Sequence, residues 1–510
     1  MTYAVTGIPS NYRAPLTAFQ LIFGLGASSA AAGPRSALYV GKKTSAGTAT
    51  INTRYAVTSE DRAIDLFGAG SDLHIIARTH IAKNPTGKVY MACHLASSGG
   101  SPVAATADIV ITGTATGTGS FIVEGCGESF EVGYVSGDTP TVMGETLEGL
   151  INARTHLPLT SVNTTGTNAV TAKAVGASQN GVYMLRVVKQ GDSGTGVSVS
   201  VSAEYLAGGV DGSTTEASLF SACLTAVAAS SDYYHGIPQT VAAFSTALKT
   251  HITNRSLPLA GKRSRGFFPA VGALGATTTI TTGLNYERLE CVWQRGASQT
   301  PQQLVAWYVA SKQLEEQVQS RFNFDNYSAN GFIKPAPDVS DWPTHESDLG
   351  DAVNAGISPI VSTDTGAYLA MGVTTRCRDA TGALEDFRAS EPHRVSVLDE
   401  LAATVSLNHQ LTYANFAQQD DPRLPDGSVD VASLSNITGR KTTPFLFKSW
   451  FLQQLQPFFD ERLQDQGAWE AGTNCRIDPE NNGRIQVTST GRTIDLHHQA
   501  TFRISETTAN

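Results

Sequence analysis

Charged side chains are scarce in this sequence. Asp, Glu, Lys and Arg make up 16% of its 510 residues, whereas roughly 25% is usual for a soluble globular protein. The formal net charge is −9, and Lys and Arg do not gather into a cluster. Because phosphate recognition needs clustered basic side chains, the composition argues against a broad nucleic-acid-binding surface and predicts no nucleic-acid partner.

Cysteine is also rare, and its spacing excludes two common frameworks. The six cysteines lie far apart, without a CxxC pair or the Cys/His spacing of a zinc site. A small disulfide-stapled fold is excluded for the same reason. We expect reduced, mostly buried thiols in a protein made in the cytoplasm, and no bound metal.

Long apolar runs are missing as well. No stretch of about 20 apolar residues occurs, so the sequence predicts no membrane span. Residues 14–34 carry no charge and end in small side chains, as cleaved signal peptides do. Their apolar core at 19–25 is short and is interrupted by Gln20 and Gly24, and the only upstream positive side chain is Arg13. We therefore expect an extended arm here rather than a secretion signal.

The short motifs of common enzymes are absent. Lys42 follows Gly41, but the first glycine and the hydroxyl of a phosphate-binding loop are missing. Gly68 and Gly70 lack the third glycine of a dinucleotide fingerprint, and neither GxSxG nor HExxH occurs. We therefore predict no enzyme activity, no catalytic residues and no cofactor. An acidic cluster without the spacing of a calcium loop reads as a solvated loop; its members are Asp420, Asp421, Asp426 and Asp430.

The chain length and the first strongly patterned segment indicate an α/β protein with several domains. At 510 residues the chain is too long for one compact core, and about three or four domains are expected. Residues 36–100 read as an α/β part of the core. Its expected elements are strands at 37–41 and 88–95 and helices at 60–67 and 72–83.

Residues 101–212 have a different composition, dominated by Thr, Gly, Ser and Val. Short alternating runs with tight turns favour strands, and only 144–154 reads as a helix. We predict a β-rich inserted surface domain that closes near residue 212. The next helix should then open with the capping box STTE at 213–216.

Residues 213–385 alternate helices with short apolar strands, a pattern that predicts a doubly wound α/β core. A long helix should begin at 301, because TPQQ at 300–303 forms a second capping box. Residues 386–492 contain helices at 395–413 and 444–463 and form an expected α+β C-terminal domain. The predicted fold class is thus α/β and multidomain, with a doubly wound core sheet, a β-rich insertion, an α+β C-terminal domain and extended terminal arms.

Both ends of the chain look like arms. Residues 1–35 lack periodicity and contain several Pro and Gly, and residues 493–510 hold a strand with apolar side chains at alternate positions. This last strand either completes the sheet of its own domain or is lent to a neighbouring subunit. The candidate inter-subunit arm residues are Tyr12, Phe19, Leu21, Phe23, Ile494, Leu496, Ala500, Phe502 and Ile504.

Several segments, in their order along the chain, resemble the tail sheath proteins of contractile-tailed phages, in particular the Mu-like group. They are IDLFGAGSDL at 64–73, THLPLT at 155–160 followed by AKAVG at 172–176, AEYLAGGVDG at 203–212, and AGISP at 355–359. The resemblance implies a subunit that stacks in six-fold rings around a rigid tube and shortens to drive it through a cell envelope. It also implies that both arms run into neighbouring subunits.

The partners and location implied by this resemblance are those of a virion tail. They are other copies of the chain, the tail tube protein, and the baseplate and tail terminator proteins, with assembly in the host bacterial cytoplasm. A headless bacteriocin tail (tailocin) or another injection device would use the same subunit. The family core is often called subtilisin-like, but no catalytic triad can be carried over to this sequence.

The helix at 444–463 is a hypothesis for the surface that faces the tube. Its aromatic stripe (Phe447, Trp450, Phe451 and Phe458) is interpreted as core. The candidate tube-facing charges are Arg440, Lys441, Lys448, Asp460, Glu461 and Arg462.

Two other classes of protein remain open from the sequence. A β-rich surface adhesin or decoration protein is suggested by residues 101–212, and it predicts a cleaved amino terminus and soluble monomers. A hydrolase on the doubly wound core is the other alternative, and it predicts labelling of one residue by a serine-reactive probe.

Overall fold

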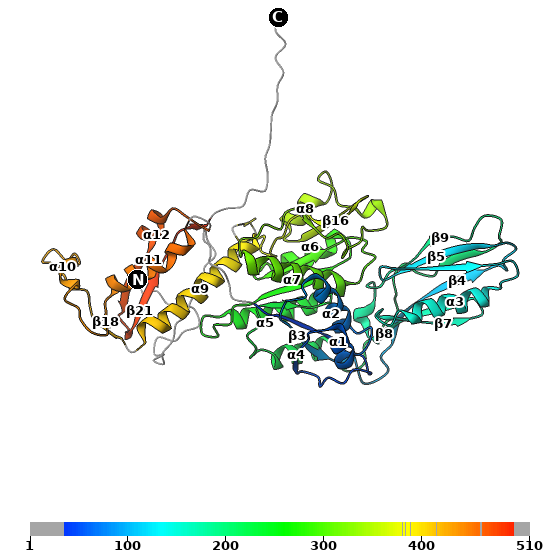
Figure 1. Cartoon of the computed structure of the whole chain (residues 1–510), viewed down its shortest axis with the longest axis horizontal. Coiled ribbons are helices and arrows are strands. Elements are labelled where there is room, and N and C mark those ends of the chain that lie inside the picture. The colour runs from blue at the N-terminus through cyan, green and yellow to red at the C-terminus, as the bar shows by residue number, and fades with distance from the viewer. Residues whose placement is uncertain are drawn as a thin grey trace, which may run out of the picture.

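The structure, a computed structural model, describes residues 35–493 apart from 380, 383, 388, 415, 460 and 461. The predicted arms therefore fall almost entirely outside the described residues, and so do all nine candidate arm residues. The described chain forms three regions arranged along the longest axis of the molecule (Figure 1). A central α/β region lies between a β-rich region and a mixed region that contains helix α9.

The central region is built on a nine-stranded mixed sheet in the order β14-β16-β15-β13-β12-β11-β1-β3-β2. Strands β1, β3, β11, β12, β13 and β15 pair in parallel, whereas β2, β14 and β16 pair antiparallel. The predicted α/β class is thus confirmed. The strands are β1 (Ala37–Lys42), β2 (Arg54–Ala56), β3 (Val89–His94), β11 (Tyr234–Gly236), β12 (Arg265–Ala270), β13 (Leu289–Trp293), β14 (Tyr327–Ser328), β15 (Ser358–Thr363) and β16 (Gly366–Leu369).

Helices cover both faces of this sheet. Along β1, Ala37 and Tyr39 pack in one apolar cluster and Leu38 and Val40 in another, because successive side chains of a strand point to opposite faces. Burial on both faces explains why the strands read as continuous apolar runs. The first cluster includes α1 (Glu60–Phe67), α2 (Asp72–Lys83) and α7 (Pro301–Val318); the second includes α4 (Glu216–Ala226), α5 (Ala242–Ser256), α6 (Leu274–Leu284) and α8 (Leu349–Asn354).

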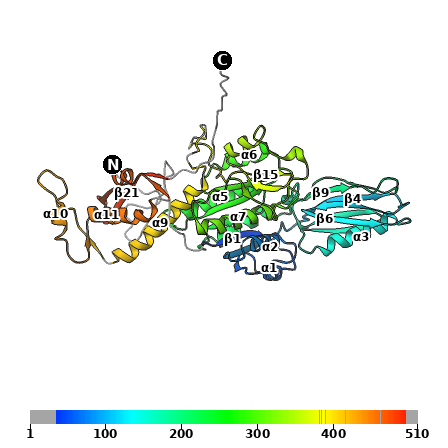
Figure 2. The same ribbon diagram turned by 45° about the horizontal axis from the view of Figure 1, so that its top comes forward.

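Residues 104–201 hold two smaller sheets and a core of their own. One sheet has the order β10-β4-β8-β7 and the other β6-β5-β9. Ile109, Phe121 and Leu147 are fully buried between them and α3, and this region projects from one end of the molecule (Figure 1, Figure 2). Its elements are β4 (Ala104–Thr112), β5 (Gly119–Gly125), β6 (Glu128–Tyr134), α3 (Pro140–Ala153), β7 (Leu159–Thr164), β8 (Thr167–Val175), the 3-10 helix η1 (Ala177–Gln179), β9 (Leu185–Lys189) and β10 (Ser198–Val201).

Helix α9 (Pro392–Tyr413) leads from the central region to the opposite end of the molecule (Figure 1). Its Leu401 and Val405 pack with Phe451 and Phe458 in a small apolar cluster. Short two-stranded sheets, β17-β18, β19-β22 and β20-β21, complete this end. The elements are β17 (Ala417–Gln418), α10 (Val431–Leu434), β18 (Lys441–Thr442), α11 (Pro444–Leu455), η3 (Gln456–Phe458), β19 (Leu463–Gln464), α12 (Gln466–Gly472), β20 (Asn474–Asp478), β21 (Asn481–Thr488) and β22 (Arg492–Thr493); η2 (Val339–Asp341) lies in the central region.

The predicted domain boundaries stay predictions, because the arrangement of these elements does not test them.

Over the described ranges, none of the helices is both long and apolar enough to cross a membrane. All six cysteines are free thiols and five are buried, as their spacing predicts.

The two predicted capping boxes have different outcomes. The box at 300–303 is confirmed, because the Thr300 side chain accepts from the Gln303 N–H and the Gln303 side chain accepts from the Thr300 N–H. The box at 213–216 is wrong. The N-cap of α4 is Thr215, without a side-chain cap bond, and the Glu216 carboxylate accepts from the buried Lys42 ammonium at 3.0 Å instead. A charged donor is the stronger partner.

Helices α6 and α11 are among those that differ from the sequence-based expectation. No helix was expected from the sequence at α6. In the structure Thr277 and Thr281 are buried, and threonine hydroxyls donate to carbonyls one turn back, as Thr282 does to Thr278 at 2.6 Å. α11 ends at Leu455 rather than at 463, because Pro457 lacks an N–H and its ring clashes with the preceding turn.

Candidate functional site: a buried charge network at the start of helix α9

A cluster of buried ionisable side chains lies where β12, β13 and α7 meet. Arg265 of β12 is fully buried. Its guanidinium donates to both oxygens of Glu316 on α7, at 2.8 and 2.7 Å, and to Glu290 on β13. Lys312, one turn before Glu316 on α7, places its ammonium 3.2 Å from the Glu290 carboxylate. Two cations therefore balance two carboxylates inside the core.

Tyrosine hydroxyls complete the hydrogen bonding of these carboxylates. Tyr234 donates to Glu316 at 3.0 Å and Tyr308 donates to Glu290 at 2.6 Å. Burial alone would raise the pKa of Glu316, but Arg265 and Lys312 outweigh burial and hold this pKa below its usual range. Glu316 is therefore ionised at neutral pH. Removing one member of such a network leaves a buried charge without its partner.

Arg35, the first residue that the structure describes, is bound into this network. Its guanidinium donates to the Ser396 hydroxyl at 2.6 Å and to the Ser396 carbonyl at 3.0 Å, and lies 4.0 Å from the Glu316 carboxylate. The same group sits over the ring of Tyr233, 4.1 Å from its centroid. Because Ser396 belongs to α9, Arg35 joins the base of the predicted N-terminal arm to both α9 and the core.

Asp399 fixes α9 to the core one turn later. Its two oxygens accept from Arg288 at 2.7 and 2.8 Å, and Tyr233 donates to it at 2.9 Å. Burial acts to raise the pKa of Asp399, but Arg288 and then Arg263 lower it further than burial raises it. The Asp399 and Arg288 side chains are 2% and 5% exposed. This bidentate pair anchors the helix that leads to the C-terminal end.

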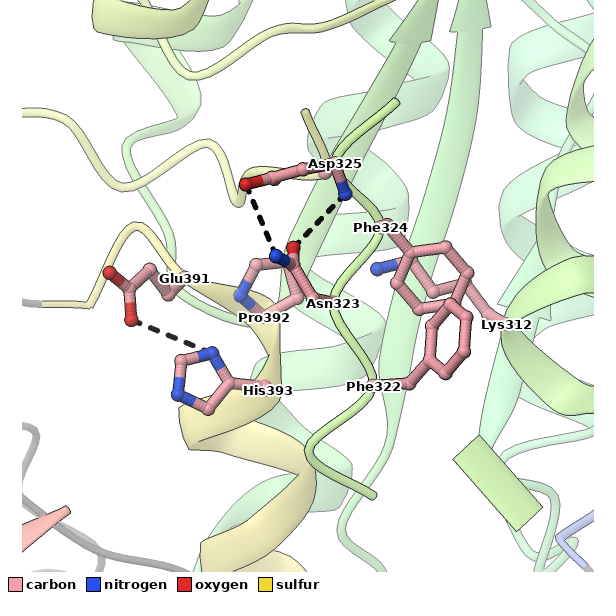
Figure 3. A pocket seen from close by; sticks show the side chains of 9 residues that line it. Lys312, Phe322, Asn323, Phe324, Asp325, Glu391, Pro392 and His393 are labelled. Carbon is pink, nitrogen blue, oxygen red and sulfur yellow. Dashed lines mark hydrogen bonds and ion pairs between the residues drawn. The ribbon is translucent and has the colours of Figure 1, made fainter. Parts of the chain in front are cut away.

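A small pocket lies beside Lys312 at the start of α9 (Figure 3). Phe322 and Phe324 form its apolar side, and the Lys312 ammonium is 3.8 Å from the centroid of the Phe324 ring. The centre of a water molecule can occupy about 10 Å³ of this pocket, which is room for about one water. The pocket is therefore too small for an organic substrate. Among the described residues, no group of three or more His, Cys, Asp or Glu side chains is placed to hold a metal ion.

The structure distributes the predicted tube-facing residues unevenly. Arg440 and Lys441 are exposed and Lys448 is half-buried on α11, whereas Asp460 and Glu461 lie outside the described residues. Arg462 is only 8% exposed and lies beyond the end of α11, so its place on an exposed helix surface is corrected. The aromatic stripe is core, as interpreted: Phe447, Phe451 and Phe458 are buried and Trp450 is half-buried.

The buried network was missing from the sequence-based prediction, although the sequence carries a signal for it. Arg265 and Glu290 each stand within a short apolar strand whose neighbours on both sides are buried. A charge in such a strand must find an opposite charge inside the core. Their partners Glu316 and Lys312 stand on α7, away from both strands in the sequence, and only the fold brings them close.

Comparison with known proteins finds similarity to a curated tail sheath protein and weak similarity to a solved sheath structure. No family model matches the chain. The Mu-like prophage FluMu tail sheath protein of Haemophilus influenzae is 31% identical over 185 residues, 35% of this chain and 37% of that protein. The match thus spans well under half of that relative's length. The solved sheath tail protein of Desulfitobacterium hafniense aligns over 91% of this chain and 97% of its own at 13% identity and a TM-score of 0.45, a similarity too low to carry an argument.

The resemblance predicted from the ordered sequence motifs is confirmed by the curated relative. The chain is similar to phage tail sheath proteins. Among them, it resembles the Mu-like group.

Proposed function

We propose that this chain is the sheath subunit of a contractile injection tail, in a phage or a phage-like particle. It polymerises as hexameric rings around an inner tube and contracts to drive that tube through the envelope of a target cell. The observation that carries the proposal is the 31% identity to a tail sheath protein over 185 residues. The subunit acts by binding and movement rather than by catalysis, and it needs no cofactor.

The partners follow from this role. They are other copies of the chain, the tail tube protein, and the baseplate and tail terminator proteins. The sheath belongs to the virion tail and assembles in the cytoplasm of the host bacterium. Head-to-tail contacts that do not close into a ring generate a helix, and a helix is the symmetry that a sheath needs.

The two arms provide the permanent connection between subunits in this proposal. Ile494, Leu496, Phe502 and Ile504 would each contribute roughly 1.5–3 kcal/mol when buried against a neighbour. An exposed ion pair contributes only about 0–1 kcal/mol. Contraction should therefore exchange surface contacts and retain the strands that one subunit lends to the next.

The buried network supports this role, because it fixes the parts of the chain to which the arms are attached. Arg35 is the last residue of the predicted N-terminal arm and contacts Ser396 and Glu316. Asp399 binds Arg288 and holds the helix that leads toward the C-terminal arm. A pull on either arm then acts on buried pairs, which are far costlier to break than exposed ones.

Three of the predicted tube-facing residues, Arg440, Lys441 and Lys448, are exposed or half-buried among the described residues, and they are used here to test the proposed tube-facing surface. Replacing all three with Glu should prevent assembly on isolated tail tubes, since the side chains that contact the tube would change sign. The matched control is Arg423→Glu, an exposed position in the same region, which should assemble normally. Normal assembly of the triple variant would reject this surface.

Negative-stain microscopy of the purified full chain tests the proposed function as a whole. A sheath subunit should form tubular polymers, and deleting residues 493–510 should abolish them. Deleting only 505–510, which leaves the alternating strand intact, should not. Monomers of the unaltered chain would favour the adhesin or decoration alternative.

A further inference from the structure

A second buried polar cluster lies where the β-rich region meets the central sheet. Lys42 ends β1, Gln239 follows β11, and between these two strands the order of the sheet changes direction. Ligands of open α/β sheets bind at such a switch point, outside the carboxyl ends of the strands. Here Gln179 and Tyr183, from the β-rich region, close over the point and line a small cavity with Lys42 and Gln239.

The charges around this cavity do not balance. The Lys42 ammonium lies 3.3 Å from Asp72 and 3.0 Å from Glu216, and all three side chains are at most 4% exposed. Although burial opposes it, these two carboxylates raise the pKa of Lys42. Burial lowers the pKa of the neighbouring His94, which adds no charge at neutral pH. One cation against two carboxylates leaves one surplus negative charge inside the protein.

Three amide oxygens at the cavity also lack a hydrogen-bond donor. Gln179, Gln239 and Gln302 are 2%, 5% and 3% exposed, and the Oε1 atom of each is buried without a partner. Their amide nitrogens already have acceptors. Gln179 donates to Ser178 at 2.7 Å, Gln239 donates to Glu216 at 3.1 Å, and Gln302 donates to Asp72 at 2.7 Å. Buried acceptors without a donor are unusual in folded proteins and destabilise them.

We propose that this cavity binds one monovalent metal cation of the alkali class, held by the amide oxygens of Gln179, Gln239 and Gln302 and by the carboxylates of Asp72 and Glu216. Hard cations take oxygen ligands of these kinds, including Asn and Gln carbonyls. An ion with a single positive charge makes the site neutral, whereas a divalent ion would leave one positive charge in excess inside the protein. The space for the centre of a water-sized particle is about 10 Å³, enough for about one particle.

The bound cation would fasten the β-rich region to the central sheet. Gln179 belongs to η1 of the β-rich region, Gln302 to the first turn of α7, and Asp72 to the first turn of α2. One ion bound by these residues would link η1 of the β-rich region to α2 and α7 of the central region. This inference rests on the described residues alone and does not depend on the proposed sheath role.

Two measurements on the full chain test the site. In crystals soaked in thallium(I), a substitute for potassium, an anomalous peak is expected between Gln239 and Gln302. The unfolding midpoint should also be higher in sodium or potassium chloride than in choline chloride at equal ionic strength, because a ligand that binds only the folded state stabilises it.

A matched pair of variants makes the test specific. Gln239→Met should lose the cation-dependent rise in midpoint. Gln294→Met should keep it, because Gln294 is also a buried amide with an unpaired Oε1 but lies outside this cavity. Equal midpoints of the unaltered chain in all three salts, or no thallium peak, would overturn the proposal and leave ordered water as the occupant. The thallium result decides if Gln239→Met fails to fold.

Discussion

The central region buries several of its ion pairs, whereas the ion pairs described within the β-rich region at 104–201 are partly or largely exposed. In the central region, Arg265–Glu316 and Arg288–Asp399 are at most 5% exposed. In the β-rich region, Lys189–Asp192 is 40% and 43% exposed, and the interior is an apolar cluster. The core of the central region therefore combines apolar packing with matched buried charges, whereas the core of the β-rich region is an apolar cluster between its sheets and α3.

Arg265→Met should have the largest effect on stability. It leaves Glu316 without its bidentate partner and Glu290 with Lys312 alone, so the free energy of unfolding should fall by about 3–5 kcal/mol. Urea unfolding followed by tryptophan fluorescence measures this, since Trp293 and Trp307 are buried in the central region. A loss below about 1 kcal/mol would show that the two regions do not differ as described.

Arg35→Met should have the next largest effect. Ser396 and Tyr233 lose the guanidinium while Glu316 keeps Arg265, so a loss of about 1.5–3 kcal/mol is expected, the range for hydrogen bonds to charged groups. Arg35→Lys should fall between the two, because an ammonium keeps the charge but not the planar fork. Unfolding in urea and the yield of polymers are the measurements. An unchanged yield of polymers from Arg35→Met would show that Arg35 is not needed to attach the N-terminal arm.

Acid should weaken the central region through its buried histidines. Burial lowers the pKa of His80 and of His251 from 6.5 to about 4. Between these values the unfolded chain binds protons that the folded chain does not, so stability is full above pH 6.5 and falls as the pH drops toward 4. Each histidine contributes a slope of up to about 1.4 kcal/mol per pH unit.

His251→Gln should flatten that slope by the share of one histidine. The exposed His345→Gln is the control and should leave the slope unchanged. Free energies of unfolding measured across this pH range decide the matter. An unaltered slope in His251→Gln would show that His251 does not contribute to the loss of stability in acid.

Lys189→Met, in the β-rich region, should have the smallest effect. The pair with Asp192 is exposed and screened by solvent, so its loss should change the free energy of unfolding very little. Tryptophan fluorescence does not report on this region directly, because residues 104–201 include no tryptophan. Unfolding of the β-rich region should be followed by circular dichroism instead. A loss as large as that of Arg265→Met would abolish the contrast between the two regions.

Local signals made much of the central fold predictable. The helices α1 and α2 occur at their predicted bounds, because Ser59 and Ser71 cap their first turns. The predicted strands β1 and β3 are recognisable as buried apolar runs. Glu216 was misread, because its sequence context resembles a cap while its true partner, Lys42, is distant in the chain. α6 was missed since its threonines bury one face and satisfy their hydroxyls within the helix.

The candidate site was much less predictable than the fold. Lys448 could be placed on a helix from its neighbours, but Arg462 could not be recognised as buried, since burial depends on contacts beyond the end of α11. Arg35, Glu316 and Asp399 meet only in the folded chain. Pairings over such distances are set by tertiary packing, which periodicity and capping do not encode.

The central claim is that subunits are joined through their ends, and the structure of the assembled polymer tests it most directly. Electron cryomicroscopy should trace residues 494–504 of each chain into a sheet of a neighbouring copy. A map in which this strand returns to the sheet of its own chain would contradict the claim.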